Sequence, residues 1–185
     1  MPGKEGIDEL DAQVRDHSEG REMTANILPS ASAEKHYPIA FNLIPQIDVF
    51  CDNLYTKEEM KMVNETKKIM EDYEMRITAT TIRVPVYRSH SESVNIELEK
   101  EVDLGAMREA LAKFPGVTVQ DDPSKQEYPM PLYTSEKDDV YVGRLRRDES
   151  CEKSYNIWVV GDQIRKGAAL NTLQIAETMI KNGWI

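Results

Sequence analysis

The most strand-like run in this chain is Thr78–Lys100, TATTIRVPVYRSHSESVNIELEK. It is rich in Val, Ile and Thr, which favour strands, so residues 75–83 and 87–100 predict two long strands. In the second, apolar and polar residues alternate from Val94 to Glu99. Because successive side chains of a strand point to opposite faces, this alternation predicts a sheet with one face in water.

Two polar residues, Arg83 and His90, interrupt this strand-like run. They can be solvated on an outer face, as charged side chains in strands usually are, or they can carry a function. They are seven residues apart, so one unbroken strand would point them to opposite faces. Pro85 predicts a broken ladder or a bulge between Val84 and Tyr87, and either irregularity would let both side chains face the same way.

Upstream of this stretch, helical spacing of apolar residues predicts a helix over residues 4–16. Residues 17–39 show no sustained period and predict an extended arm that packs on something. In residues 40–50 the proline limits the chain to an edge strand, a bulge or an irregular buried segment. Thr56 opens the clearest helix, TKEEMKMVNETKKIMED, and Glu59 three residues later completes a capping box.

Downstream, Asp103 caps a predicted helix that ends before Pro115-Gly116. Three further strands and a C-terminal amphipathic helix follow, at residues 117–119, 139–148, 156–162 and 163–184. The apolar residues of the last helix, among them Ile164, Ala168, Leu173, Ile175 and Ile180, are expected to cover the sheet. This order predicts an α+β fold, a mixed, mostly antiparallel sheet with helices packed on one face, with residues 1–185 forming one domain.

Composition narrows the class of protein. The 185 residues carry a net charge of −10, which argues against nucleic acid as a partner. No apolar run reaches the roughly 20 residues needed to cross a bilayer, and the N-terminus does not resemble a signal peptide, so we expect neither a membrane nor an export route. The two cysteines stand far apart without metal-ligand spacing, so we expect no metal, no disulfide and a cytoplasmic protein.

The motifs of self-contained enzymes are missing from the sequence. There is no GxGxxG turn and no P-loop, so we expect no complete nucleotide-phosphate cradle. Cys51 follows an apolar run, and Cys151 lies in the acidic segment DESCEK, which would raise a thiol pKa. Neither cysteine is predicted to be a nucleophile.

The remaining polar candidates are Arg83, His90 and the pair Glu58 and Lys61 on the helix that Thr56 opens. The pair is three residues apart and can be an ordinary surface ion pair, which contributes roughly 0.2–0.5 kcal/mol. Together these groups could bind and deprotonate a small molecule, but they could not run a covalent redox cycle.

Several motifs in this order resemble one family. They are FNLIPQIDVF (41–50), YTKEEMKMVNETKKIM (55–70), RVPVYRSHSESVNIELEK (83–100), YPMPL (128–132), VGRLRRD (142–148) and WVVGDQIRKGAALNTLQIAE (158–177). They resemble the C-terminal half of bacterial aspartate-semialdehyde dehydrogenases, and the resemblance covers nearly the whole chain.

The resemblance implies the substrate-binding and dimerisation domain of an NADP-dependent oxidoreductase of aspartate-family amino acid biosynthesis, the route to lysine, threonine and methionine. That enzyme converts L-aspartate 4-semialdehyde, phosphate and NADP+ to 4-aspartyl phosphate and NADPH. By motif, Arg83 is expected to bind the substrate carboxylate with its planar fork and His90 to act as the general acid/base. Glu58 is expected to hold the substrate ammonium group, and Lys61 the phosphate.

The resemblance also implies a contact from Gln163 to the NADP cofactor, with Asn171 as a further cofactor contact, and a homodimer. The family's N-terminal half, with its NADP-binding domain and its cysteine in an Asn-Cys-Ser-Thr context, has no counterpart in these residues. We therefore expect the isolated chain to be inactive as a dehydrogenase. The alternative is a non-catalytic dimerising interaction module.

Overall fold

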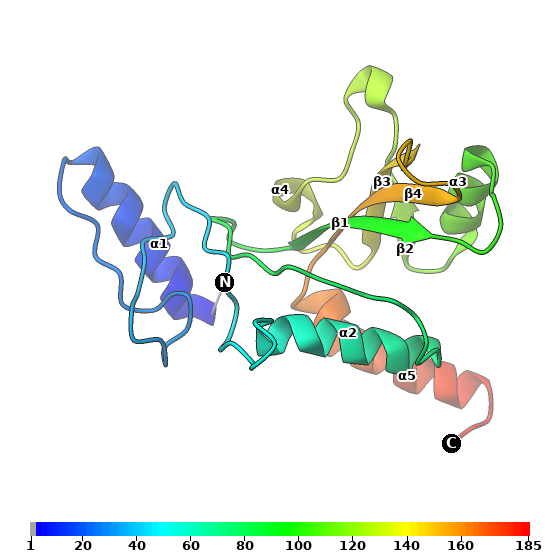
Figure 1. Ribbon diagram of the computed structural model, residues 1–185, viewed down its shortest axis with the longest axis horizontal. Coiled ribbons are helices and arrows are strands. Elements are labelled where there is room, and N and C mark those ends of the chain that lie inside the picture. The colour runs from blue at the N-terminus through cyan, green and yellow to red at the C-terminus, as the bar shows by residue number, and fades with distance from the viewer. Residues whose placement is uncertain (1–2) are drawn as a thin grey trace. The chain divides into compact units, whose positions relative to one another are not determined.

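The computed structural model describes residues 3–185, and the chain divides into two compact units, Met1–Tyr87 and Arg88–Ile185. The first unit begins with α1 (Gly3–Ser18), which confirms the helix predicted over residues 4–16 and includes the first two residues of the predicted arm. Figure 1 shows how residues after α1 fold back along it as irregular chain. Apolar residues of α1 and of this chain form one core, Leu10, Leu28, Ile39, Ala40 and Ile44, with Met23 packed against it. The arm therefore packs on α1.

A single buried amide ties the arm to α1. Gln13 is buried, and its Oε1 accepts the backbone N–H groups of Ile39 (2.9 Å) and Ala40 (3.0 Å). Its Nε2 donates to the backbone oxygen of Thr24 (2.8 Å). Since irregular chain lacks ladder partners for its backbone groups, this side chain supplies the partners that a strand would otherwise provide.

Helix α2 (Lys57–Met70) confirms the predicted capping box. The hydroxyl of Thr56 accepts the N–H of Glu59 (3.2 Å), and Oε2 of Glu59 accepts the N–H of Thr56 (2.8 Å). The second carboxylate oxygen of Glu59 accepts the N–H of Thr81 (2.9 Å), so the cap also ties α2 to the segment that follows it.

The strand predicted over residues 75–83 is wrong. Apart from an isolated bridge between Ile44 and Arg83, this segment has no ladder partner in the described structure. Side chains of α2 and its N-terminal turn take the place of one, since Tyr55 lies 2.9 Å from the Thr78 hydroxyl and Glu59 binds Thr81. Strand propensity needs a neighbouring strand to act, and this segment has none.

A pH dependence follows from Glu59. Burial by itself raises the pKa of this carboxyl, but the N–H donors of Thr56 and Thr81 outweigh burial and lower the pKa below its ordinary value. The resulting stability is present above the ordinary carboxyl pKa and is lost as the pH falls through the lowered one. Glu59→Gln should therefore destabilise the chain by about 1.5–3 kcal/mol at pH 7, the usual contribution of hydrogen bonds to a charged group. Chemical unfolding at pH 7 and below pH 4 should show the difference shrinking in acid, whereas Glu65→Gln, on the same helix, should show none at either pH.

The second unit holds a four-stranded sheet among its described residues, with strands β1 (His90–Glu97), β2 (Val117–Val119), β3 (Val140–Arg147) and β4 (Ser154–Gly161) (Figure 1). Their spatial order is β1-β4-β3-β2. The β1–β4 and β4–β3 pairs are antiparallel, and β2 pairs with β3 in parallel. This confirms the predicted mixed, mostly antiparallel sheet and the three downstream strands, while β1 is shorter than the predicted 87–100.

One face of the sheet packs against α3 (Leu104–Lys113). Asp103 caps this helix as predicted, accepting the N–H groups of Gly105 (2.8 Å) and Ala106 (3.1 Å). The buried core between them consists of Met107, Val142, Leu145 and Tyr155, with Ile96 and Ile157 among the partly buried residues around it. Within β1 the expected alternation is present from Val94 to Glu97, since Val94 and Ile96 are half-buried whereas Asn95 and Glu97 are exposed.

The opposite face is crossed by the chain between β2 and β3, which contains η1 (Pro123–Lys125) and α4 (Pro131–Thr134). Trp158 of β4 faces this side, since it alternates with the core residue Ile157. Its indole Nε1 donates to the backbone oxygen of Pro129 (2.9 Å), which fastens the crossing chain to the sheet.

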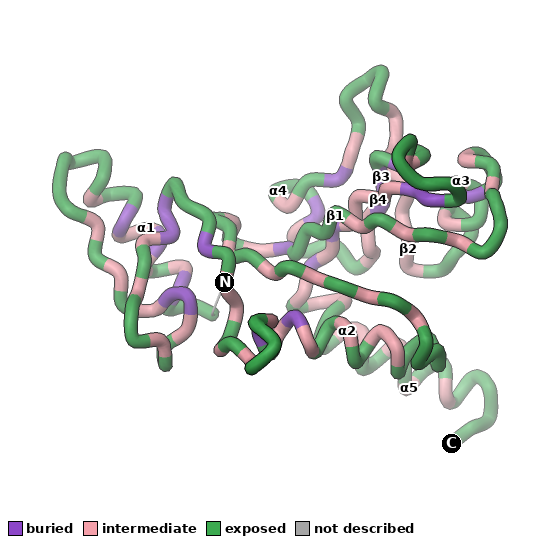
Figure 2. Tube along the Cα trace, in the orientation of Figure 1, coloured by how far each residue is buried: buried purple, intermediate pink, exposed green. Residues whose placement is uncertain are grey.

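The expectation that the C-terminal helix covers the sheet is wrong. The helix forms as η2 (Arg165–Ala169) and α5 (Leu170–Lys181), with non-helical backbone angles at Ala168. The apolar residues meant to reach the sheet are exposed, with Leu173 63% and Ile180 64% accessible. Figure 2 shows α5 with no buried residue. The helix is interrupted at Ala168, and α3 already covers the apolar face of the sheet.

Candidate functional site

Three of the predicted site residues, Glu58, Lys61 and Arg83, belong to the first unit. Glu58 and Lys61 lie on the first turns of α2, and Lys61 Nζ is 3.4 Å from Glu58 Oε2, at the long end for an ion pair. Burial lowers the pKa of the Arg83 guanidinium, while the charges of Glu58 and Asp48 act on it in the opposite direction. Glu58 of α2 and Arg83 are therefore close enough for the charge of one to act on the other.

The guanidinium of Arg83 is half-buried and only partly used. Its Nη2 lies 3.5 Å from the backbone oxygen of Pro29, which is a weak contact. Its Nε is buried and has no hydrogen-bond partner among the described residues. Buried polar groups are normally paired, so this unpaired N–H is a donor that a ligand oxygen would satisfy as acceptor. A carboxylate matches such a planar fork in geometry and charge.

The other predicted site residues, His90, Gln163 and Asn171, belong to the second unit. His90 is the first residue of β1, is exposed, and pairs with Gly161 of β4. Gln163 follows shortly after β4, and its Oε1 accepts the backbone N–H of Ser89 (2.9 Å). Asn171 lies on α5, half-buried and away from this contact. The structure thus brings Gln163 to the residue next to His90 and does not do so for Asn171.

The irregularity predicted between Val84 and Tyr87 is confirmed. The chain bends at Pro85, Tyr87 and Arg88 instead of continuing as a strand, and Ser89 has a φ of 74°. No regular ladder therefore forces Arg83 and His90 onto opposite faces. The boundary between the two units falls in this bend, and a joint site of the two residues remains a prediction.

Sequence reasoning missed a buried acid beside these residues. Asp162 is fully buried, and Oδ2 of its carboxylate lies 2.7 Å from Nε of Arg88. Burial by itself raises the pKa of Asp162, but the N–H groups of Glu136 and Ile164 and the Arg88 guanidinium outweigh it and lower the pKa. An Asp directly after a strand and before a helical segment is an N-cap signal, which could have identified it.

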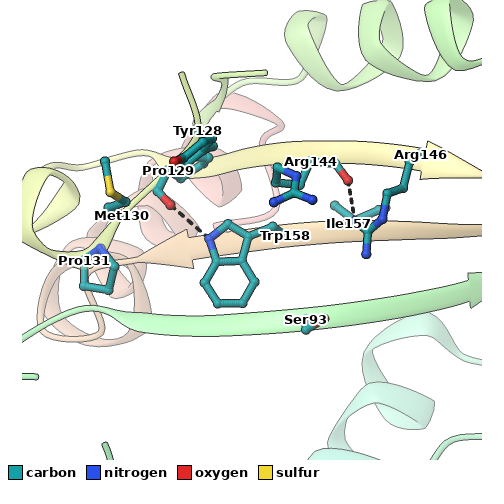
Figure 3. Close-up of a pocket in the computed structure, with 9 residues that line it drawn as sticks. All are labelled: Ser93, Tyr128, Pro129, Met130, Pro131, Arg144, Arg146, Ile157 and Trp158. Carbon is teal, nitrogen blue, oxygen red and sulfur yellow. Dashed lines mark hydrogen bonds between the residues drawn. The ribbon is translucent and has the colours of Figure 1, made fainter. Parts of the chain in front are cut away.

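A surface pocket of about 360 Å³ lies on the face of the sheet that is turned away from α3. Figure 3 shows Trp158 between Pro129 and its neighbours on one side and the two arginines Arg144 and Arg146 on the other. Arg146 donates to the backbone oxygen of Arg144 (2.8 Å). None of the predicted site residues lines this pocket, so it is separate from the predicted chemistry.

Residues 3–185 contain no group of three or more His, Cys, Asp or Glu side chains that could hold a metal ion. Cys51 is half-buried and Cys151 is exposed, and both are free thiols. In the same residues, no helix combines the length and the apolar character needed to cross a membrane.

Comparison with known proteins supplies a family. A sequence model described as "Semialdehyde dehydrogenase, dimerisation domain" matches residues 2–166. The aspartate-semialdehyde dehydrogenase of Aquifex aeolicus is 47% identical over 183 residues, which is 99% of this chain and 52% of that protein. The Bacillus subtilis enzyme of the same name is 47% identical over 180 residues, 97% of this chain and 52% of that protein.

Solved structures agree. Aspartate semialdehyde dehydrogenase II of Vibrio cholerae superimposes with a TM-score of 0.86 at 40% identity, covering 96% of this chain and 50% of that one, and it has also been crystallised in complex with ASA. The Candida albicans enzyme, crystallised with NADP, shares the fold at 20% identity with a TM-score of 0.62, covering 98% of this chain and 65% of that one. The chain spans about half the length of the Aquifex aeolicus and Bacillus subtilis relatives. Because the match to the family extends over most of its residues, this chain belongs to the semialdehyde dehydrogenase dimerisation-domain family.

Proposed function

We propose that the chain is the substrate-binding and dimerisation half of an NADP-dependent aspartate-semialdehyde dehydrogenase. The reaction is the reversible conversion of L-aspartate 4-semialdehyde, phosphate and NADP+ to 4-aspartyl phosphate and NADPH, in aspartate-family amino acid biosynthesis in the cytoplasm. The observation that supports it most directly is the near-complete match of this chain to half of relatives that carry that name.

In this proposal the first unit recognises the substrates. Arg83 binds the carboxylate through its guanidinium, whose Nε has no hydrogen-bond partner among the described residues. Glu58 binds the substrate ammonium group, and Lys61 binds phosphate. The 3.4 Å separation of these two side chains is loose enough for each to exchange its partner for a ligand group of opposite charge.

The second unit moves the proton. His90 accepts the thiol proton of the catalytic cysteine, which the other half of the enzyme supplies, and later serves the hydroxyl of the thiohemiacetal. The cysteine thiolate adds to the aldehyde carbon of the substrate to form this thiohemiacetal. The same carbon then loses hydride and becomes a thioester, and a phosphate oxygen displaces the thiolate. An exposed imidazole at the start of a strand is accessible to both groups.

NADP, when bound, accepts the hydride. Gln163 is suited to contact NADP through its Nε2 donor, because its Oε1 already accepts the N–H of Ser89. Asn171 is a second candidate for a cofactor contact. These 185 residues contain no glycine-rich phosphate cradle, so most of the cofactor contacts belong to the other half of the enzyme.

Activity should require both halves. The chain alone should show no NADP-dependent turnover of aspartate semialdehyde, and mixing it with the N-terminal half of the Bacillus subtilis relative should restore turnover. In that mixture His90→Gln should lower kcat by about 10²–10⁴-fold, the usual contribution of a general acid/base. His36→Gln is the control, since His36 contacts the backbone oxygen of Ser30 and has no proposed role. Turnover by the isolated chain, or an unchanged kcat in His90→Gln, would contradict the proposal.

The alternative is a non-catalytic module that pairs with a second copy of itself. The family description "dimerisation domain" favours the pairing, which is one part of this alternative. Both readings include a homodimer, which light scattering of the purified chain should show. They differ in ligand response: a substrate-binding half is stabilised thermally by aspartate semialdehyde or phosphate, whereas a bare module is not. Arg83→Lys should remove the stabilisation by aspartate semialdehyde.

A further inference from the structure

His90 occupies a position where backbone order is normally low. It is the first residue of β1, and β1 is an edge strand with β4 as its one neighbour in the sheet. Its pairing with Gly161 is the last of the β1–β4 ladder. Local opening of such a strand end costs little free energy, so an acid/base at this position needs further contacts to fix its backbone.

Side chains continue the ladder beyond its last backbone pair. The N–H of Ser89 donates to Oε1 of Gln163 (2.9 Å). The Arg88 guanidinium forms an ion pair with the Asp162 carboxylate, in which Nε lies 2.7 Å from Oδ2 without hydrogen-bond geometry. The two residues before His90 are thus tied to the two residues after Gly161. The His90–Gly161 pair therefore has the backbone ladder on one side and these two side-chain contacts on the other.

Asp162, at the far end of the tie from Arg88, is itself bound by backbone donors. Oδ2 of Asp162 accepts the N–H of Glu136 (2.7 Å), and Oδ1 accepts the N–H of Ile164 (2.9 Å). Its carboxylate is fully buried, and a buried charge that loses its cation is costly, so the pair with Arg88 resists opening.

Ser89 is held in a conformation that it would not adopt freely. Its φ of 74° lies in the left-handed region, which residues other than glycine rarely occupy, and its side chain is buried. Its hydroxyl lies 3.2 Å from that of Ser135 and 3.3 Å from that of Thr134. Such backbone persists only where surrounding contacts determine it.

We propose that Arg88, Ser89, Asp162 and Gln163 form a clamp whose task is to position His90. Asp162 and Arg88 are positioning residues, since they act through the backbone that carries His90. The use of His90 in catalysis rests on the proposed function, whereas the clamp itself is a local property of this unit.

The clamp can be tested on the 185-residue chain by amide hydrogen exchange followed by NMR. Arg88→Met should reduce protection of the amides of residues 90–92 at least tenfold relative to those of residues 94–96, and Arg88→Lys should recover part of it. The matched control is Arg108→Met. Arg108 also pairs with a buried aspartate of this unit, Asp121, at 2.6 Å, but does so away from β1.

Because Arg88→Met leaves the Asp162 charge buried without its cation, the double variant Arg88→Met, Asp162→Asn serves where the single variant fails to fold. It removes both charges and keeps an oxygen that can accept the N–H of Ile164. Selective loss of protection at residues 90–92 in this variant supports the clamp, and unchanged protection there in a folded variant overturns it.

A catalytic measurement separates the clamp from the proposed function. In the mixture with the relative's N-terminal half, Arg88→Met should lower kcat with little change in the KM for aspartate semialdehyde, and Arg108→Met should change neither. If exchange at residues 90–92 rises in Arg88→Met but His90→Gln leaves kcat unchanged, the clamp stands and the proposed role of His90 fails. If exchange is unaffected, the clamp fails whatever the activity of His90→Gln.

Discussion

Replacing Gly143 by alanine should destabilise the second unit by roughly 3 kcal/mol, the upper end of the usual cost of overpacking a core. Gly143 lies in β3 opposite Trp158, where the chain between β2 and β3 crosses the sheet. A Cβ at this position would lie 2.2 Å from the backbone oxygen of Gln120 and 2.7 Å from Cδ of Pro129. The space for a side chain is therefore taken by backbone and by a proline ring.

The crossing chain cannot easily move away. The N–H of Gln120 donates to the backbone oxygen of Val142 (2.8 Å), so shifting the carbonyl of Gln120 strains a bond to the residue next to Gly143. Pro129 is held by Trp158 through its own backbone oxygen. A methyl group at residue 143 must therefore separate the crossing chain from the sheet.

Gly161→Ala is the matched control, because Gly161 is also a strand glycine of this sheet. Its nearest neighbour would be Cγ2 of Val140 at 3.7 Å, an ordinary van der Waals contact. Its unfolding free energy should stay within about 0.5 kcal/mol of the parent chain, as for substitutions away from packing constraints. Urea unfolding of the three proteins checks this, and equal midpoints for the two variants would contradict the steric explanation.

The second large effect is expected at Gln13. Gln13→Ala should destabilise the first unit by about 3 kcal/mol or more, since each buried polar group left without a partner costs about 1–3 kcal/mol. The substitution leaves the N–H groups of Ile39 and Ala40 and the oxygen of Thr24 without the amide that binds them. Ile39 and Ala40 are almost completely buried, so water cannot easily replace the lost bonds.

Limited proteolysis and urea unfolding would measure this effect. Gln13→Ala should make residues 19–40 accessible to protease, whereas Gln46→Ala, which removes an exposed amide bonded to the backbone oxygen of Asp48, should not. Gln13→Glu gives a finer test, because a carboxylate can still accept from Ile39 and Ala40 but repels the oxygen of Thr24. Its stability should fall between those of the parent and Gln13→Ala, and a loss equal to that of Gln13→Ala would show that the two accepted bonds contribute little.

Part of the candidate site could be predicted from the sequence, and part could not. The motifs that carry Arg83, His90 and Gln163 pointed to the family that the comparisons then showed. The roles of these residues remain proposals. The pairing of Asp162 with Arg88 was missed, because two residues 74 positions apart show no common pattern until the fold places them 2.7 Å from each other.

Features that rest on neighbouring residues could be predicted from the sequence. The capping box of Thr56 and Glu59, the Asp103 cap, the alternation in β1 and the break at Pro85 all follow from contacts or dihedral limits within a few positions. Contacts between distant residues set three other features. Residues 75–83 pair with no strand, α5 does not cover the sheet, and Gln13 binds the arm. Those outcomes depend on which distant groups satisfy a backbone or cover an apolar face, and local propensity does not contain that information.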